Sequence, residues 1–144
     1  MKILVIEDSR LLRLALSRML GKAGHEVIAA GDGQEGLRRA QQIHPDMILL
    51  DMMLPSLEGT GVLRLLKQGA VTKNIPVVVL SGLSQKNEQK LKESGAAGYI
   101  EKSILDLNGD GAPLLSALNE LMKEVTVGHE EMRMATAARA ARRG

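Results

Sequence analysis

The chain has 144 residues with 44% hydrophobic residues and a formal net charge of +2, a composition typical of one globular domain with its own core. It contains no cysteine, which excludes disulfides and thiolate metal sites, and its 1% of aromatic residues leaves little for stacking on nucleic-acid bases. No apolar run approaches the roughly 20 residues that span a bilayer, so we expect a cytoplasmic protein without a membrane anchor.

Short apolar runs alternate with longer stretches of helical periodicity. The predicted strands are Lys2–Ile6, Val27–Ala30, Met47–Leu50, Val77–Leu80 and Gly98–Ile100. The predicted helices are Ser9–Gly24, Gly33–Ile43, Gly59–Lys67, Gln85–Ser94 and Pro113–Val125. Strands that alternate with helices predict right-handed crossovers and a parallel sheet, and strands that are apolar throughout require helices on both faces. The predicted fold class is therefore α/β, with a doubly wound five-stranded parallel sheet.

Two of the predicted helices carry local signals in their sequence. The first has an apolar stripe formed by Leu11, Leu12, Ala15, Leu16, Met19 and Leu20. The second is preceded by Asp32, with Glu35 three residues later, and this spacing predicts a capping box at its start.

Polar residues follow four of the five predicted strands. Glu7 and Asp8 come after the first, Asp51 after the third, Ser81 after the fourth and Lys102 after the fifth. Sites in open α/β sheets lie beyond the carboxyl ends of the strands, so these side chains are candidates for one pocket. Three carboxylates in one pocket repel each other unless a cation binds there, and hard oxygen ligands without cysteine favour Mg²⁺ over Zn²⁺.

A pocket of this kind suggests phosphoryl chemistry. Mg²⁺ held by a few carboxylates usually also binds a phosphate, and a carboxylate can be the nucleophile that accepts the phosphoryl group. Ser81 would then donate a hydrogen bond to one phosphoryl oxygen, and Lys102 would neutralise another.

At this point the chain resembles a response-regulator receiver domain of two-component and phosphorelay signalling, similar to the chemotaxis regulators. The motifs that carry the resemblance are VIEDSR (Val5–Arg10), LLDMMLPSLEGTG (Leu49–Gly61), VVLSG (Val78–Gly82) and GYIEKS (Gly98–Ser103). Each motif alone is weak, but the ordered set is specific, and the match covers about residues 1–126. The resemblance implies a flavodoxin-like fold with strand order 2-1-3-4-5.

The resemblance also implies roles for individual residues. Asp51 would be the phosphoacceptor. Glu7 and Asp8, together with Asp51 and the backbone carbonyl of Met53, would hold Mg²⁺. The phosphoryl donor would be a histidine kinase or a histidine phosphotransfer protein, and the chain would catalyse only its own phosphorylation and dephosphorylation.

The remaining implied roles concern signal output. Ser81 and Lys102 would contact the phosphoryl group, and Ser81 with Tyr99 would form a switch. That switch would repack the face formed by the fourth helix, the fifth strand and the last helix, where a protein target binds or a homodimer forms. The stimulus, the cognate kinase and the target are not encoded in any motif.

One position departs from the family pattern. Ser103 follows Lys102, where the family usually has proline, and because a non-prolyl cis bond costs about 2.5–4 kcal/mol we expect a trans bond and an altered loop. The connection from Lys102 to Pro113 is long and contains DLNGDG, which opens like a calcium loop. Ala117 stands where that loop needs a bidentate glutamate, so we interpret the segment as a turn-rich connection.

The expected domain organisation is a receiver domain over residues 1–127 and an Ala/Arg-rich tail over residues 128–144. The tail is interpreted either as a solvated continuation of the last helix or as a basic element for an acidic partner or a dimer. No DNA-binding domain is expected, so the chain is a stand-alone receiver or a fragment of a longer protein.

The sequence argues against two other functions. A phosphatase with an aspartyl-phosphate intermediate tends to carry a second aspartate two residues after the nucleophile, and Met53 occupies that place. A pseudo-receiver that binds partners without phosphorylation is disfavoured because Glu7, Asp8, Asp51, Ser81 and Lys102 are all present.

Overall fold

The computed structural model describes residues 1–52, 59–82, 93–105 and 108–123. Its strands are β1 (Lys2–Ile6), β2 (Glu26–Ala30), β3 (Met47–Asp51), β4 (Val77–Ser81) and β5 (Gly98–Glu101). Its helices are α1 (Arg10–Lys22), α2 (Gly33–Ile43), α3 (Gly59–Gln68), the 3-10 helix η2 (Lys102–Ile104) and a C-terminal helix over residues 112–123. Most of the helix predicted at Gln85–Ser94, and all of the tail at 128–144, lies outside the described residues.

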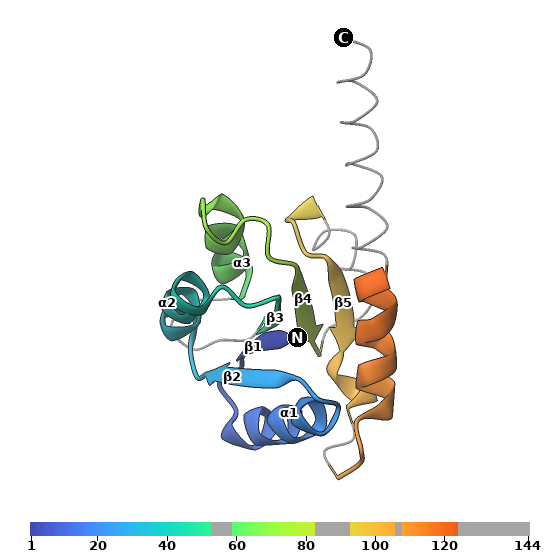
Figure 1. The fold of residues 1–144 in the computed structure, drawn as a ribbon. Coiled ribbons are helices and arrows are strands. Elements are labelled where there is room, and N and C mark those ends of the chain that lie inside the picture. Colours follow the sequence, from blue (N-terminus) through green and yellow to red (C-terminus); the bar gives the residue numbers. More distant parts are fainter. Residues whose placement is uncertain (53–58, 83–92, 106–107, 124–144) are drawn as a thin grey trace, which may run out of the picture.

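All five strands are parallel and follow the order β2-β1-β3-β4-β5, which confirms the predicted fold class and strand order. The chain runs from β1 outward to β2, and then crosses back over β1 to β3 on the other side (Figure 1). The order of the strands therefore reverses between β1 and β3, and the carboxyl ends of these two strands border the crevice where such sheets bind ligands.

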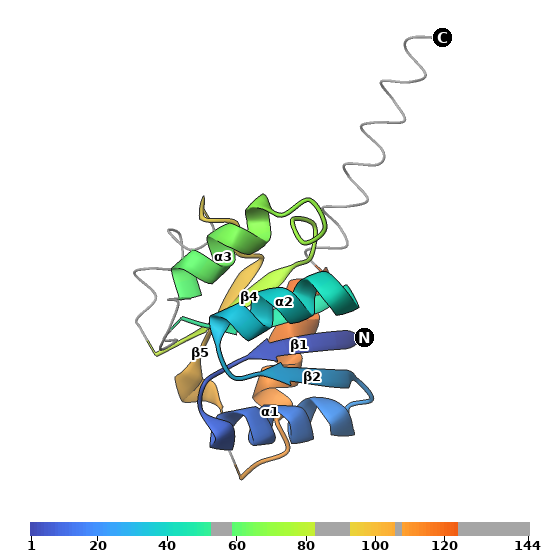
Figure 2. The same ribbon diagram turned by 90° about the vertical axis from the view of Figure 1, so that its left-hand side faces the viewer.

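Helices cover both faces of the sheet. The two ribbon views place α2 and α3 on one face and α1 with the C-terminal helix on the other (Figures 1 and 2). Side chains alternate along each strand, so that Leu4 and Ile6 of β1 pack toward α2 and α3, whereas Ile3 and Val5 pack toward α1. Burial on both faces explains why the central strands are apolar throughout. Within the described residues, none of the helices has the length and apolarity that a membrane span requires.

The first helix differs in one respect from the predicted apolar stripe. Ala15, Leu16, Met19 and Leu20 are buried against the sheet, but Leu11 is 67% exposed. Successive residues of a helix are rotated by 100°, so the sheet covers the stripe centred on Leu16 and leaves Leu11 at its margin.

Side chains cap the starts of α1 and α2. Oγ of Ser9 accepts a hydrogen bond from the backbone N–H of Leu12 at 3.3 Å, and Oδ1 of Asp32 accepts one from Glu35 at 2.8 Å. In an ordinary capping box, the carboxylate of Glu35 would accept a hydrogen bond from the N–H of the capping residue Asp32. Here it accepts from the N–H of Gly31, one residue earlier, so the predicted capping box forms with its second hydrogen bond displaced by one residue.

The connection after β5 lies against α1. No cis peptide occurs in the described part of the chain, as expected for Ser103. Arg18 of α1 donates a hydrogen bond to the carbonyl of Gly109, and Gly111 adopts a φ of +81° where a Cβ would lie 2.7 Å from Cβ of Met19. Asp110 accepts from the N–H of Ala112 at the start of the C-terminal helix, which supports a capping turn rather than a calcium loop.

Candidate functional site

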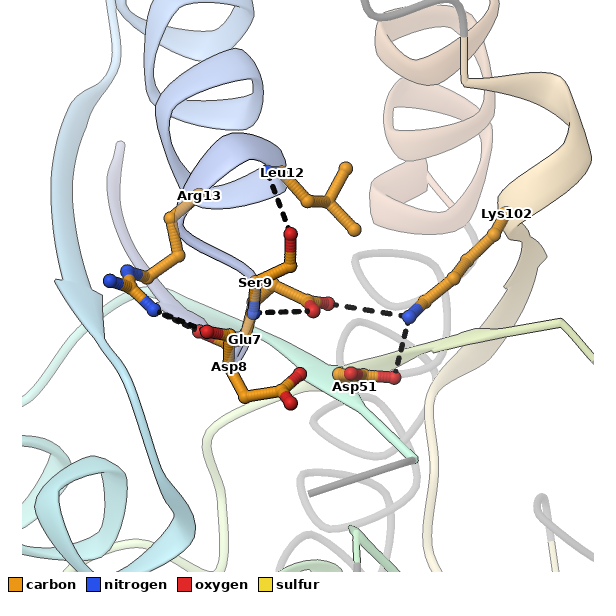
Figure 3. Close-up of polar contacts among 7 residues, drawn as sticks. All are labelled: Glu7, Asp8, Ser9, Leu12, Arg13, Asp51 and Lys102. Atoms are coloured by element: carbon orange, nitrogen blue, oxygen red, sulfur yellow. Dashed lines mark hydrogen bonds and ion pairs between the residues drawn. The ribbon is translucent and has the colours of Figure 1, made fainter. Parts of the chain in front are cut away.

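Three carboxylates meet at the carboxyl ends of β1 and β3. Glu7 and Asp8 lie in the turn between β1 and α1, and Asp51 is the last residue of β3. One carboxylate oxygen from each lies within 4.8 Å of the other two (Figure 3). Glu7 and Asp51 are each 1% exposed, whereas Asp8 is exposed. The structure therefore brings together all three acidic residues that the sequence placed at this edge.

Lys102 supplies the positive charge of the pocket. It follows β5 as the first residue of η2, and its Nζ lies 2.9 Å from Oδ1 of Asp51 and 3.5 Å from Oε2 of Glu7. Burial alone would lower the pKa of Lys102, but the hydrogen bond to Asp51 and the charges of both carboxylates outweigh it and raise this pKa. The lysine is therefore a fixed cation at the site.

One lysine does not balance the charge of the three carboxylates. The pKa of Glu7 rises from 4.5 to about 7, first because of burial and then because of the negative charge of Asp51. The N–H of Ser9 and the charge of Lys102 oppose this rise. Oε2 of Glu7 is buried without a hydrogen-bond partner among the described residues. Such an atom is suited to accept a cation.

The donor set fits Mg²⁺. All side-chain ligands available in the cluster are carboxylate oxygens, which are the hard ligands that Mg²⁺ prefers, and the exposed Asp8 leaves the cluster open to water. The backbone carbonyl of Met53, which the resemblance assigns as a further ligand, lies outside the described residues.

The turn that carries Glu7 and Asp8 is held by several hydrogen bonds. The N–H of Glu7 donates to the carbonyl of Ala30 in β2 at 3.0 Å, and the N–H of Ser9 donates to Oε1 of Glu7 at 3.2 Å. Nη1 of Arg13 donates to the carbonyls of Glu7 and Asp8, both at 2.9 Å. Sequence reasoning missed Arg13, because an arginine in the first turn of a helix is also what a solvated helix face contains.

Ser81 and Tyr99 lie on adjacent strands. Ser81 is the last residue of β4 and is 2% exposed, and Tyr99 of β5 is half-buried and packs against the core beneath α2 and α3. Tyr99 pairs with Val79 and Glu101 pairs with Ser81, so the two side chains point to the same face with an offset of two residues. Both side chains therefore lie on the face of the sheet that α2 and α3 cover.

A cavity of about 320 Å³ adjoins the pocket. Its lining consists of Glu7, Ser9, Leu11, Leu12, Lys102 and Leu105. It lies between the first turn of α1 and the connection that follows β5, and its lining runs from the polar side chains of Glu7 and Lys102 to the exposed Leu11.

Comparisons with known proteins give a consistent result. The family model of the response regulator receiver domain matches residues 3–109. Protein PilH of Pseudomonas aeruginosa is 33% identical over 122 residues, which cover 84% of this chain and 97% of PilH. A protein-glutamate methylesterase/protein-glutamine glutaminase of Archaeoglobus fulgidus is 35% identical over 131 residues, but the match spans only 35% of that longer protein.

Solved structures show the same likeness. The chemotaxis response regulator CheY4 of Vibrio cholerae has a TM-score of 0.74 and 30% identity, over 83% of this chain and 97% of that chain. With the family model matching well over half of its residues, the chain belongs to the response regulator receiver family.

Proposed function

We propose that the chain is a phosphoacceptor response regulator in which Asp51 receives a phosphoryl group in a Mg²⁺-dependent reaction. The observation that carries this proposal is the buried Asp51 carboxylate, with the carboxylates of Glu7 and Asp8 within 4.8 Å and Nζ of Lys102 at 2.9 Å. Family membership supports it, because accepting a phosphoryl group is the family's function.

The reaction transfers one group between two nucleophiles. The N–P bond of a donor phosphohistidine breaks, its electron pair returns to the imidazole, and a carboxylate oxygen of Asp51 forms a new O–P bond. Bound Mg²⁺ would neutralise charge shared by the carboxylates and the phosphoryl oxygens. Lys102 offsets the negative charge beside Asp51, and Glu7 and Asp8 are the residues that would hold the cation.

We assign the output to Ser81 and Tyr99. The hydroxyl of Ser81 would bind a phosphoryl oxygen, and the ring of Tyr99 would follow it, changing the face made by β5 and the C-terminal helix. A histidine kinase or histidine phosphotransfer protein in the cytoplasm is the proposed donor, and a protein target, or a second copy of the chain, is the proposed reader. Residues 1–127 are the proposed receiver domain, with residues 128–144 as a separate basic tail.

The test is the intact mass of the protein after incubation with acetyl phosphate and Mg²⁺. We expect wild type to gain one phosphoryl group, and both chelation of Mg²⁺ and the Asp51→Asn substitution to abolish the gain. Asp46→Asn is the matched control, because the Asp46 carboxylate accepts a hydrogen bond from the N–H of Lys2, away from the pocket.

A folded wild-type protein that gains no phosphoryl group would contradict the proposal. It would favour the alternative of an interaction module that acts without phosphorylation. Equal labelling of wild type and Asp51→Asn would instead place the acceptor at another residue.

A further inference from the structure

Arg13 contacts the acidic turn from the side away from the pocket. Its Nη1 donates to two successive backbone carbonyls, those of Glu7 and Asp8, and both distances are 2.9 Å (Figure 3). These two residues carry the carboxylates that the proposed metal requires. The guanidinium therefore binds the backbone of the ligand pair without contacting their carboxylates in any described interaction.

The planar peptide between Asp8 and Ser9 links the arginine to the pocket. The carbonyl and the N–H of a trans peptide point in opposite directions. Here the carbonyl of Asp8 accepts from Arg13, and the N–H of Ser9 donates to Oε1 of Glu7 at 3.2 Å. A guanidinium bond to the carbonyl orients and polarises the peptide, which strengthens the bond at its other end. Oε1 of Glu7 is thereby held by the backbone, and Oε2 is left facing Lys102.

The position of Arg13 is itself well defined. Its backbone N–H donates to the carbonyl of Ser9 at 2.9 Å, and Ser9 caps α1. Its guanidinium lies over Gly31, where an added Cβ would be 3.3 Å from Nη1. The first turn of α1 and the end of β2 thus place the side chain where it can reach both carbonyls.

We propose that Arg13 is a positioning residue for the cation site, which acts through the Asp8–Ser9 peptide to orient the carboxylate of Glu7. This inference rests on the proposed function, because it assumes that Glu7 and Asp8 hold Mg²⁺. It adds a residue outside the ligand set and gives the route by which that residue acts.

The direction in which Mg²⁺ affinity changes when Arg13 is removed distinguishes a positioning role from a purely electrostatic one. A guanidinium near the site repels Mg²⁺, so removal of its charge alone would strengthen Mg²⁺ binding. Loss of positioning predicts the opposite result, because partners that orient metal ligands typically contribute roughly 10-fold to 100-fold in metal affinity. Weaker binding in Arg13→Ala therefore cannot come from the lost charge.

The first experiment measures Mg²⁺ binding to the full chain by titration calorimetry. We expect the Kd to rise roughly tenfold in Arg13→Ala, the lower end of the range for such partners. The Kd of Arg13→Lys is expected to lie between those of wild type and Arg13→Ala, since lysine keeps a charged N–H donor. Arg18→Ala is the matched control, because Arg18 lies on the same helix and donates to the carbonyl of Gly109 in the connection after β5. Alanine favours helix, so both variants preserve α1.

The second experiment needs no metal. Amide hydrogen exchange of metal-free protein, followed by NMR, reports on the N–H of Ser9. We expect protection of this amide in wild type and in Arg18→Ala, and exchange at least several-fold faster in Arg13→Ala. A merely structural role for Arg13 would speed exchange along the whole of α1 instead of at this peptide.

Several outcomes overturn the inference. If Arg13→Ala binds Mg²⁺ as tightly as wild type, or more tightly, Arg13 does not position the site, although the metal site itself is confirmed. An unprotected Ser9 amide in metal-free wild type removes the proposed route. Wild type that binds no Mg²⁺ overturns both this inference and the proposed function. The first two outcomes overturn the inference alone, so its failure can be told apart from failure of the proposed function.

Discussion

Glu7 lies where its charge is unfavourable until a cation arrives. The side chain is 1% exposed, and burial together with the charge of Asp51 raises its pKa to about 7. Its Oε1 has the N–H of Ser9 as a partner, and its Oε2 lies 3.5 Å from Nζ of Lys102. The metal-free protein therefore carries an electrostatic penalty that a bound cation would relieve.

Glu7→Gln is expected to stabilise the metal-free protein at high pH. The folded state binds the Glu7 proton more tightly than the unfolded state, so wild-type stability falls as pH rises from about 4.5 to about 7. Above pH 7 the penalty is fully present and is on the order of 3 kcal/mol for this shift. Glutamine keeps an acceptor for the Ser9 N–H and carries no charge. Urea unfolding in EDTA at pH 8 and pH 5 measures the effect.

The advantage of Glu7→Gln should shrink toward pH 5 and vanish below pH 4.5, where wild type is neutral in both states. Glu26→Gln is the control, since Glu26 is exposed on β2 and its substitution should leave the pH dependence unchanged. An advantage that stays constant with pH would contradict the electrostatic origin of the penalty.

At the scale of elements, two helical glycines differ in their surroundings: one is required by close packing and the other is not. Gly36 lies in the buried face of α2, and a Cβ added there would come within 2.5 Å of Cδ1 of Ile6 in β1. Gly21 lies in the exposed last turn of α1, and a Cβ there would meet nothing within 4 Å. Close approach of α2 to the central strand explains the first glycine, and no packing constraint explains the second.

Alanine at these two positions should change stability in opposite directions. Gly36→Ala is expected to lower the free energy of unfolding by about 1–3 kcal/mol, because the methyl group overpacks the contact with Ile6. Gly21→Ala is expected to raise it by up to about 1 kcal/mol through helix propensity. Urea denaturation followed by circular dichroism measures both. Stabilisation by Gly36→Ala would show that α2 does not pack on β1 as closely as described.

At the scale of the whole molecule, binding of a cation at the carboxylate cluster would be linked to folding. The three carboxylates come from the turn after β1 and from the end of β3, so they are brought together only when the sheet forms around these strands. Any cation that binds this folded cluster stabilises the whole domain, since the unfolded chain offers no equivalent site.

Mg²⁺ is expected to raise the free energy of unfolding by about 1.4 kcal/mol at ten times its Kd. The increase should be smaller at pH 6 than at pH 8, because Mg²⁺ must displace the proton of Glu7. Asp8→Asn should abolish most of the increase. Asp32→Asn should retain it, because asparagine caps α2 as well as aspartate does. Thermal unfolding with and without Mg²⁺ compares these variants, and an unchanged increase in Asp8→Asn would remove Asp8 from the site.

Much of the fold and the site was readable in the sequence. Apolar runs predicted every strand to within one residue. The signal is clearest for the central strands, which are buried on both faces and are therefore apolar up to their last residue. The same runs made the residues after them conspicuous, so that Glu7, Asp51 and Lys102 were predicted as neighbours and are found together. Periodicity also found the buried centre of α1.

Only the tertiary structure decided the rest. The exposure of Leu11 depends on how far the sheet extends beneath α1, which periodicity does not encode. The burial of Glu7, and hence its raised pKa, depends on the distance between two strands that are forty residues apart in sequence. Arg13 acquires its role from the direction of a single peptide in the turn. Local sequence determines which residues are strand, helix or strand end, whereas distances between elements determine how those residues interact.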